Sequence, residues 1–259
     1  MSQHKVFANR VRQFVWPQSH CPVCGSLHNG CGLCDQCHEL LTKQNLCLHC
    51  PTIIPQGTVL CRECALGIKN PFLQGVSGYV YEGRLRNNIL NFKYHNKSEL
   101  HRPLALLLRE LVEQRLPYQQ FDLVLAVPVS KQTMERRGYN HMQLVADILA
   151  AELKLSTSPI ALRRVRYTRK LNKLNRSERE KELVGAFNAD SKRVFGKNIL
   201  LIDDIFTTGA TARACTEALL AAGSKSVYLA TIASAVLQSN EKYRKQIDKT
   251  RACSDSLKL

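Results

Sequence analysis

Apolar residues between positions 76 and 232 recur with the periods of strands and helices. The run FDLVLAVPV is continuously apolar, which is typical of a strand buried on both faces. Strands are predicted at 76–81, 121–129, 198–205 and 226–232. Helices are predicted at 85–94, 98–115, 140–155 and 211–222. This alternation indicates an α/β fold, with a parallel sheet flanked by helices.

The pattern divides the 259 residues into four parts. Close cysteine pairs characterise the second part, and the strands and helices lie in the third. The parts are an N-terminal segment (1–19), a cysteine-rich module (20–69), the α/β domain (70–237) and a polar tail (238–259).

Nine of the 11 cysteines lie between Cys21 and Cys64, and eight of them form four CxxC units. Two residues between thiolates let a tight turn point both sulfurs at one ion, and two such units complete a tetrahedral zinc site. Such a site leaves no open position for water, so the module is predicted to be a double zinc ribbon with two structural zinc ions. The predicted ligands are Cys21, Cys24, Cys34 and Cys37 for one ion, and Cys47, Cys50, Cys61 and Cys64 for the other.

Spacing leaves alternatives to this ligand set. An interleaved pairing of the four units stays open, and Cys31 forms a competing CxxC unit with Cys34. We favour Cys34 with Cys37 because the four units are then nearly evenly spaced. Neighbouring histidines could substitute as ligands. Because eight cysteines already supply two complete sites, we expect these histidines to lie near the ions without binding them. These histidines are His20, His28, His38 and His49.

Charge and targeting signals narrow the partner and the compartment. Lys and Arg total 37 against 21 Asp and Glu, which gives a formal net charge of +16. This balance favours a partner that carries phosphate. The first 20 residues contain no continuous apolar stretch, and no run approaches the roughly 20 apolar residues that span a bilayer. We expect a cytoplasmic protein without a membrane span, in which disulfides are disfavoured.

The segment ILLIDDIFTTGAT at 199–211 is the most informative one. Its apolar residues lead to Asp203 and Asp204, which are expected at the C-terminal edge of the sheet, where open α/β folds bind ligands. A loop of hydroxyl residues and Gly209 follows and leads into a helix. Such a loop offers backbone amides and hydroxyls to a phosphate at the positive end of the helix.

A second loop, VPVSK at 127–131, also follows a buried strand and precedes the basic turn RRGYN. Without a ligand, this segment would simply end the strand and lead into a solvated basic turn. A diphosphate, however, needs several donors to hold its charge. The candidate diphosphate ligands are Ser130, Lys131, Arg136 and Arg137.

These motifs carry a resemblance to known proteins. The segment 199–211 resembles the phosphoribosyl diphosphate motif of type I phosphoribosyltransferases. Together with the double CxxC module and the motif VPV…RRGYNH, it resembles the ComF family over about residues 20–233.

The resemblance implies that Asp203 and Asp204 engage the ribose 2- and 3-hydroxyls of phosphoribosyl diphosphate, with Mg²⁺ bridging the diphosphate and the ribose. It also implies that Lys93, which follows an apolar helix, lies at the ligand site. The residues implied to wrap the 5-phosphate are Thr207, Thr208, Gly209, Ala210 and Thr211.

Half of the excess positive charge lies between the two loops. Residues 161–197 contain 12 Lys or Arg and four Asp or Glu, a net charge of +8. A charged loop is usually solvated, but an aromatic among arginines also suits single-stranded nucleic acid. Two residues, Leu171 and Glu182, depart from the glutamine and asparagine usual in the family, which puts a contact over the ligand in doubt. The nucleic-acid candidates are Arg163, Arg164, Arg166, Tyr167 and Arg169.

Two functions are therefore considered. In the first, a domain that binds phosphoribosyl diphosphate or ribose 5-phosphate serves uptake or processing of single-stranded DNA during natural transformation, as the resemblance implies. The zinc module would then contact nucleic acid or a helicase-type partner. In the second, the chain transfers phosphoribose to an unidentified nitrogen nucleophile, although no residue stands out as a general base.

Overall fold

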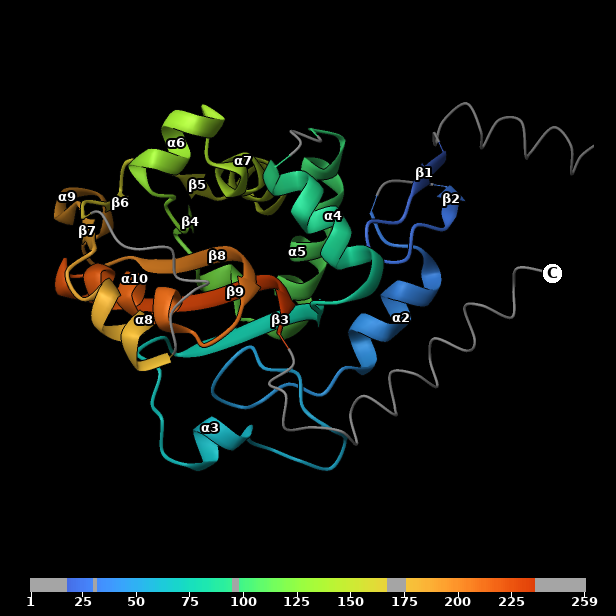
Figure 1. The fold of residues 1–259 in the computed structure, drawn as a ribbon, viewed down its shortest axis with the longest axis horizontal. Coiled ribbons are helices and arrows are strands. Elements are labelled where there is room, and N and C mark those ends of the chain that lie inside the picture. The colour runs from blue at the N-terminus through green and yellow to red at the C-terminus, as the bar shows by residue number, and fades with distance from the viewer. Residues whose placement is uncertain (1–17, 30–31, 95–97, 167–175, 236–259) are drawn as a thin grey trace, which may run out of the picture.

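The computed structural model describes residues 18–29, 32–94, 98–166 and 176–235. At its centre is a five-stranded sheet in the order β3-β9-β8-β4-β5, in which every pairing is parallel (Figure 1). The strands are β3 (Gln74–Val80), β4 (Leu123–Ala126), β5 (Ser156–Thr157), β8 (Asn198–Phe206) and β9 (Ser226–Ser234). The predicted fold class is confirmed.

Helices cover both faces of the sheet, because alternate residues of a strand point to opposite faces. On β8, Leu200 and Ile202 pack with the helices of one face, while Ile199 and Leu201 pack with the other. The first face carries α4 (Gly83–Tyr94), α5 (His101–Arg115) and α7 (His141–Leu153), and the second carries α10 (Ala210–Ala221).

The four predicted strands and four predicted helices are all present, with shifted ends. The strand predicted at 121–129 is too long: β4 ends at Ala126, and Pro128 has no amide with which to continue a ladder. The helix predicted at 98–115 divides into the 3₁₀ turn η1 (Ser98–Leu100) and α5, and Pro103 falls in the first turn of α5, as required.

Shorter elements were not predicted. They lie between the predicted strands and helices, and most have too few residues to show a period. They are η2 (Tyr118–Gln120), α6 (Lys131–Arg137), β5 (Ser156–Thr157), β6 (Leu162–Arg164), α8 (Arg176–Leu183), β7 (Phe187–Ala189) and α9 (Ser191–Val194).

The cysteine-rich module lies along one edge of the α/β domain and beneath it (Figure 1). It consists of an antiparallel strand pair and two helices, joined by loops. Its elements are β1 (Gln18–His20), β2 (Leu27–Asn29), α2 (Asp35–Lys43) and α3 (Arg62–Ala65). Within the described part of the chain, no helix has both the length and the apolar character needed to cross a membrane.

Candidate functional site

Two groups of four cysteines form in the order that the sequence suggests. Within each group, all four sulfur atoms lie within 4.8 Å of one another. The sulfurs of Cys24 and Cys34 are 3.6 Å apart, and those of Cys50 and Cys61 are also 3.6 Å apart. Neighbouring CxxC units are therefore paired, and the two groups could each hold a metal ion. Cys31 lies outside the described residues.

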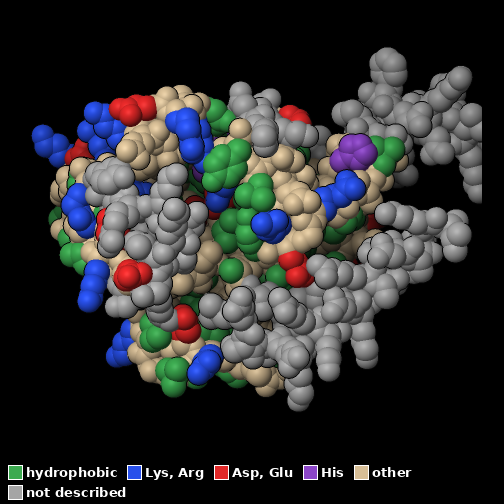
Figure 2. All heavy atoms as spheres, viewed as in Figure 1, with side chains coloured by type: hydrophobic (Ala, Val, Ile, Leu, Met, Phe, Trp, Pro, Cys, Tyr) green, Lys and Arg blue, Asp and Glu red, His purple; other side chains and the backbone are tan. Residues whose placement is uncertain are grey.

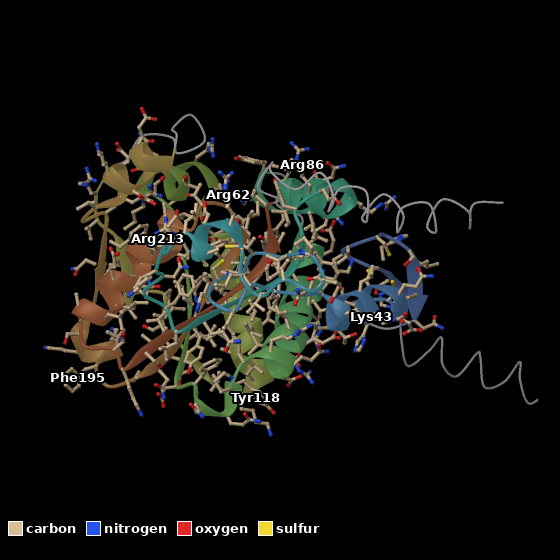
Figure 3. The ribbon with its side chains drawn as sticks, turned by 90° about the horizontal axis from the view of Figure 1, so that it is seen from below. Lys43, Arg62, Arg86, Tyr118, Phe195 and Arg213 are labelled. Carbon is tan, nitrogen blue, oxygen red and sulfur yellow. The ribbon has the colours of Figure 1, made fainter. Side chains whose placement is uncertain are left out.

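The same local structure builds both groups. In each, a turn supplies the first two cysteines and the start of a helix supplies the others. Cys34 is the N-cap of α2 and Cys37 lies in its first turn, just as Cys61 is the N-cap of α3 and Cys64 lies within that helix. Figure 3 shows the sulfur atoms in two separate places, one of them beside the helix that carries Arg62.

The donor set of the second group suits a cation. A hydrogen bond with Cys50 lowers the pKa of Cys47 to about 4, and the same contact raises the pKa of Cys50. Burial raises the pKa of Cys64 to about 12. A positive ion would allow all four sulfurs to be thiolates, and four sulfurs in this arrangement fit zinc.

The two groups are attached to different parts of the α/β domain. At the first, the Tyr79 hydroxyl on β3 donates to the Cys37 carbonyl at 2.6 Å. At the second, Asn70 donates to the His49 carbonyl and accepts a hydrogen bond from Arg213 of α10 at 3.3 Å. Arg213 also donates to the carbonyl of Thr208 at 3.0 Å, so the second group is tied to the expected phosphate loop (Figure 3).

The two expected ribose ligands, Asp203 and Asp204, lie within β8 rather than beyond its end. The strand continues to Phe206 because it pairs with β9 as far as Ser234. Consecutive residues of a strand point to opposite faces. Asp204 therefore faces α4 and α7, whereas Asp203 faces α10.

Asp204 is buried and held by two side chains. Its Oδ1 lies 2.9 Å from the Lys93 ammonium of α4, and its Oδ2 accepts a hydrogen bond of 2.7 Å from Nε2 of His141 of α7. Burial alone would raise the pKa of Asp204, but Lys93 and His141 outweigh burial and hold that pKa well below its usual range. Asp204 is a carboxylate at neutral pH, and Lys93 lies at the expected site.

Asp203 has a different environment. Its Oδ1 accepts a hydrogen bond from the Asp204 amide at 2.9 Å. Burial, followed by the neighbouring Asp204 charge, raises the pKa of Asp203 to about 8. At neutral pH, Asp204 is therefore ionised and Asp203 is mostly protonated, and a nearby cation would favour ionisation of Asp203.

The loop after β8 has the form expected of a phosphate site. Gly209 is the N-cap of α10 with a φ of 73°, and a Cβ there would lie 2.8 Å from the Phe206 ring. Only glycine adopts this conformation without strain. Thr207 is exposed, and Thr208 and Thr211 are half-buried. The first amides of α10, beginning at Ala210, meet this loop at the positive end of the helix.

The candidate diphosphate residues occupy the start and the end of α6. Ser130 caps α6 by accepting a hydrogen bond from the Thr133 amide at 3.2 Å. Lys131 is exposed and lies 3.9 Å from Glu135. Arg136 and Arg137 lie over the ring of Tyr94, at 5.8 and 4.9 Å from its centroid.

Sequence reasoning missed His141. Arg137 donates to Nδ1 of His141 at 3.2 Å, and His141 in turn donates to Asp204, so this histidine joins the second loop to the carboxylates. One signal was available: the histidine follows RRGYN directly, where Asn140 begins a helix. No periodicity could show that this helix start meets β8.

Comparison with known proteins agrees with this geometry. A family described as phosphoribosyl transferase domain matches residues 136–256. The DNA utilization protein YhgH of Salmonella typhimurium is 28% identical over 214 residues, which cover 76% of this chain and 94% of that protein. Competence protein F of Haemophilus influenzae is also 28% identical over 214 residues, covering 80% of this chain and 92% of the relative. These relatives bear out the resemblance to the ComF family over most of the chain.

A solved structure is also similar to part of this chain. The structure of the allosteric regulatory enzyme of purine biosynthesis shares 20% sequence identity over 55% of this chain and 29% of its own, with a TM-score of 0.37.

Two arginines of the basic segment make contacts within the protein. Arg164 lies over the Phe187 ring at 5.6 Å, and burial lowers its pKa. Arg166 donates to the carbonyls of Glu182 and Val184 at the end of α8. Arg163 is exposed. Tyr167, Arg169 and Leu171 lie outside the described residues.

Proposed function

We propose that this chain binds phosphoribosyl diphosphate, or a ribose 5-phosphate ligand, at the C-terminal edge of its sheet, and acts in uptake or processing of single-stranded DNA. One observation carries the first half of the proposal. β8, the loop 207–209 and the start of α10 place a carboxylate pair beside unpaired helix amides.

In this proposal the two ends of the ribose meet different groups. The loop and the first amides of α10, with the hydroxyls of Thr207, Thr208 and Thr211, hold the 5-phosphate. Asp203 and Asp204 accept hydrogen bonds from the ribose hydroxyls. The hydrogen-bond acceptors of both carboxyls support this role. A ribose hydroxyl could donate to Asp204 in place of His141, and to Asp203 in place of the Asp204 amide.

The diphosphate would lie toward α6. Arg137 is the best-placed donor because it is half-buried and already joined to the carboxylates through His141. Ser130, Lys131 and Arg136 lie on the same loop and helix and add donors or positive charge. Mg²⁺, when bound, would neutralise diphosphate oxygens, and that ion is held mostly by ligand oxygens and water.

The DNA half of the proposal rests on two supports. The relatives are named for DNA utilization and for competence, and the chain carries a net charge of +16. Figure 2 shows Lys and Arg side chains gathered over α6 and α9. A positive surface of this kind attracts a nucleic-acid backbone. We place this action in the cytoplasm, with the zinc module contacting DNA or a helicase-type partner.

The ligand site is tested by calorimetry with phosphoribosyl diphosphate and Mg²⁺. We expect Asp204→Asn to abolish measurable binding, because Lys93 and His141 would then hold an amide in place of the carboxylate. Asp147→Asn is the matched control, since Asp147 is an exposed carboxylate on α7. Equal affinity of Asp204→Asn and the wild-type protein would reject the site.

The DNA role requires a separate test. Because Arg164 and Arg166 make internal contacts, reversing their charge would disturb the fold, and Arg163→Glu is the informative variant. We expect it to weaken binding of a single-stranded oligonucleotide while leaving the affinity for phosphoribosyl diphosphate unchanged. The control is Arg86→Glu on α4, which removes an equally exposed arginine elsewhere (Figure 3). Equal loss in both variants would remove residue 163 from the DNA surface.

A second candidate function is phosphoribosyl transfer to a nitrogen nucleophile. It is favoured by Arg137, which can stabilise the diphosphate as the bond from its oxygen to ribose C1 breaks and the nucleophile bonds to C1. The discriminating measurement is release of diphosphate from phosphoribosyl diphosphate in the presence of bases, amines or single-stranded DNA. Release above the rate of the Asp204→Asn variant identifies a transferase, and binding without release identifies a binding protein.

A further inference from the structure

His141 has a fixed hydrogen-bonding arrangement. It is the first residue of α7 and is 4% exposed. A guanidinium can only donate, so Nδ1 of His141 accepts from Arg137 at 3.2 Å, which leaves Nε2 to carry the ring proton. Nε2 then donates to Oδ2 of Asp204 at 2.7 Å.

The surroundings of His141 keep this arrangement in place. The Phe92 ring packs edge-on against the imidazole, with centroids 5.1 Å apart. Asn140 fixes the start of α7 by donating to the Val127 carbonyl at 3.0 Å. The imidazole is therefore held in place between a guanidinium and a carboxylate.

Arg137 forms the other end of this connection. It belongs to the last turn of α6, which ends at Gly138 in a left-handed conformation. Its guanidinium rests on the Tyr94 ring, which is itself 58% exposed. No carboxylate pairs with Arg137 in the described part of the chain, so an incoming diphosphate competes with the Nδ1 atom of His141 for the N–H groups of Arg137.

We propose that His141 is a positioning residue that makes the diphosphate and ribose halves of the site bind cooperatively. This proposal rests on the proposed function of the site. While Arg137 donates to Nδ1, it polarises the ring and strengthens the hydrogen bond from Nε2 to Asp204, because hydrogen bonds in a chain reinforce one another. A diphosphate that draws Arg137 away weakens that bond and frees Asp204 to accept from a ribose hydroxyl.

The test uses the two halves of the ligand as separate probes. The affinity for ribose 5-phosphate is measured by calorimetry with and without saturating inorganic diphosphate, both with Mg²⁺. We expect diphosphate to raise the affinity by about fivefold or more, the usual lower range for coupled sites. Independent binding of the two probes to the wild-type protein would overturn the proposal.

Two substitutions of His141 separate positioning from packing. His141→Gln can accept from Arg137 through its amide oxygen and donate to Asp204 through its amide nitrogen, so the coupling is expected to persist. His141→Phe keeps a ring against Phe92 but neither donates nor accepts, so the coupling should vanish. Undiminished coupling in His141→Phe would contradict the proposal, since a purely structural role does not distinguish these variants.

A measurement on the wild-type protein guards against a variant that fails to fold. The imidazole ¹⁵N resonances of His141 should show the proton on Nε2, and inorganic diphosphate should shift the Nδ1 resonance as Arg137 leaves. An unmoved Nδ1 resonance at saturating diphosphate would overturn the coupling. If phosphoribosyl diphosphate itself does not bind, the proposed function fails. If it binds while its two halves bind independently, only the coupling fails.

Discussion

The two cysteine groups share their ligand spacing and local structure but differ in what they hold in place. The first packs in one buried cluster with α4, α5 and β3, and its Pro22 carbonyl accepts a hydrogen bond from Asn88 of α4. The second lies beside Asn70, which contacts Arg213 of α10. The same arrangement of four cysteines thus contacts α4, α5 and β3 in one place and, through Asn70 and Arg213, the loop before α10 in the other.

The two cysteine groups also differ in the arginine that contacts the chain beside each of them. Arg115, at the end of α5, donates to the carbonyls of Leu41, Thr42 and Gln44, which follow the first group. Arg213 donates to Asn70 beside the second group and to Thr208 in the phosphate loop. The side chain of Arg213 is only 12% exposed, so these contacts are shielded from water. Removing each arginine should therefore have separate consequences.

Loss of one ligand from each group should give the largest effect. We expect Cys37→Ser to lower the free energy of unfolding by roughly 4 kcal/mol, the size associated with loss of a metal site. Cys61→Ser should lower it less, because Leu48, Val59 and Leu66 near the second group are exposed and that region can open locally. Denaturant unfolding measures both changes.

Metal content and ligand affinity provide the control for these two variants. Each should hold one zinc instead of the two expected for the wild-type protein, and only Cys61→Ser should lose affinity for phosphoribosyl diphosphate. Equal loss of affinity in both variants would show that the second cysteine group does not support the ligand site more than the first does.

A proton on Asp203 relieves the crowding of negative charge in the carboxylate pair, whereas a metal cation would do so in each cysteine group. The stability of the folded protein should therefore depend on pH. Burial and Asp204 raise the pKa of Asp203 to about 8, against 3.8 ordinarily. Between these values the folded state retains a proton that the unfolded chain has lost. Stability from Asp203 should therefore fall as pH rises from about 4 to 8, by at most about 1.4 kcal/mol per unit.

Unfolding in urea at pH 6, 7 and 8 tests this dependence. We expect about 2 kcal/mol to be lost over that range and Asp203→Asn to remove most of the slope, whereas Asp147→Asn should leave the slope unchanged. A slope that persists in Asp203→Asn would assign the effect to other groups.

The two arginines should give the smallest and most specific effects. Arg213→Leu removes the contacts of Thr208 and Asn70, and we expect it to weaken binding of phosphoribosyl diphosphate about tenfold, or about 1.4 kcal/mol. Arg115→Leu should instead lower the melting temperature and leave the affinity within experimental error. Calorimetry and thermal unfolding distinguish the two, and exchanged or identical outcomes would show that both cysteine groups support the same part of the protein.

Much of the site could be predicted because its residues are close in sequence. The CxxC spacing indicated both cysteine groups, and the segment 199–211 indicated a strand, a glycine loop and a helix in the right order. Lys93 was expected from resemblance alone. The C-terminal end of the strand at 121–129 was wrong, because an apolar run does not reveal where pairing stops.

Contacts between distant residues could not be predicted. His141 and Asp204 are 63 residues apart, and only the packing of α7 against the sheet brings them within 2.7 Å. The link from Asn70 to Arg213 spans 143 residues. Local sequence patterns do not indicate such pairs, because they reflect the helix or loop in which each residue lies and not the residues that pack against it in the folded protein.

The sequence by itself determined the local structure of this protein: the CxxC units that supply the cysteines, and the glycine loop that precedes a helix. These follow from turn geometry and helix ends, which depend on a few adjacent residues. The tertiary structure alone decided that Asp203 and Asp204 face opposite sides of the sheet with opposite pKa shifts. Burial and neighbouring charge set those shifts, and both exist only after the chain has folded.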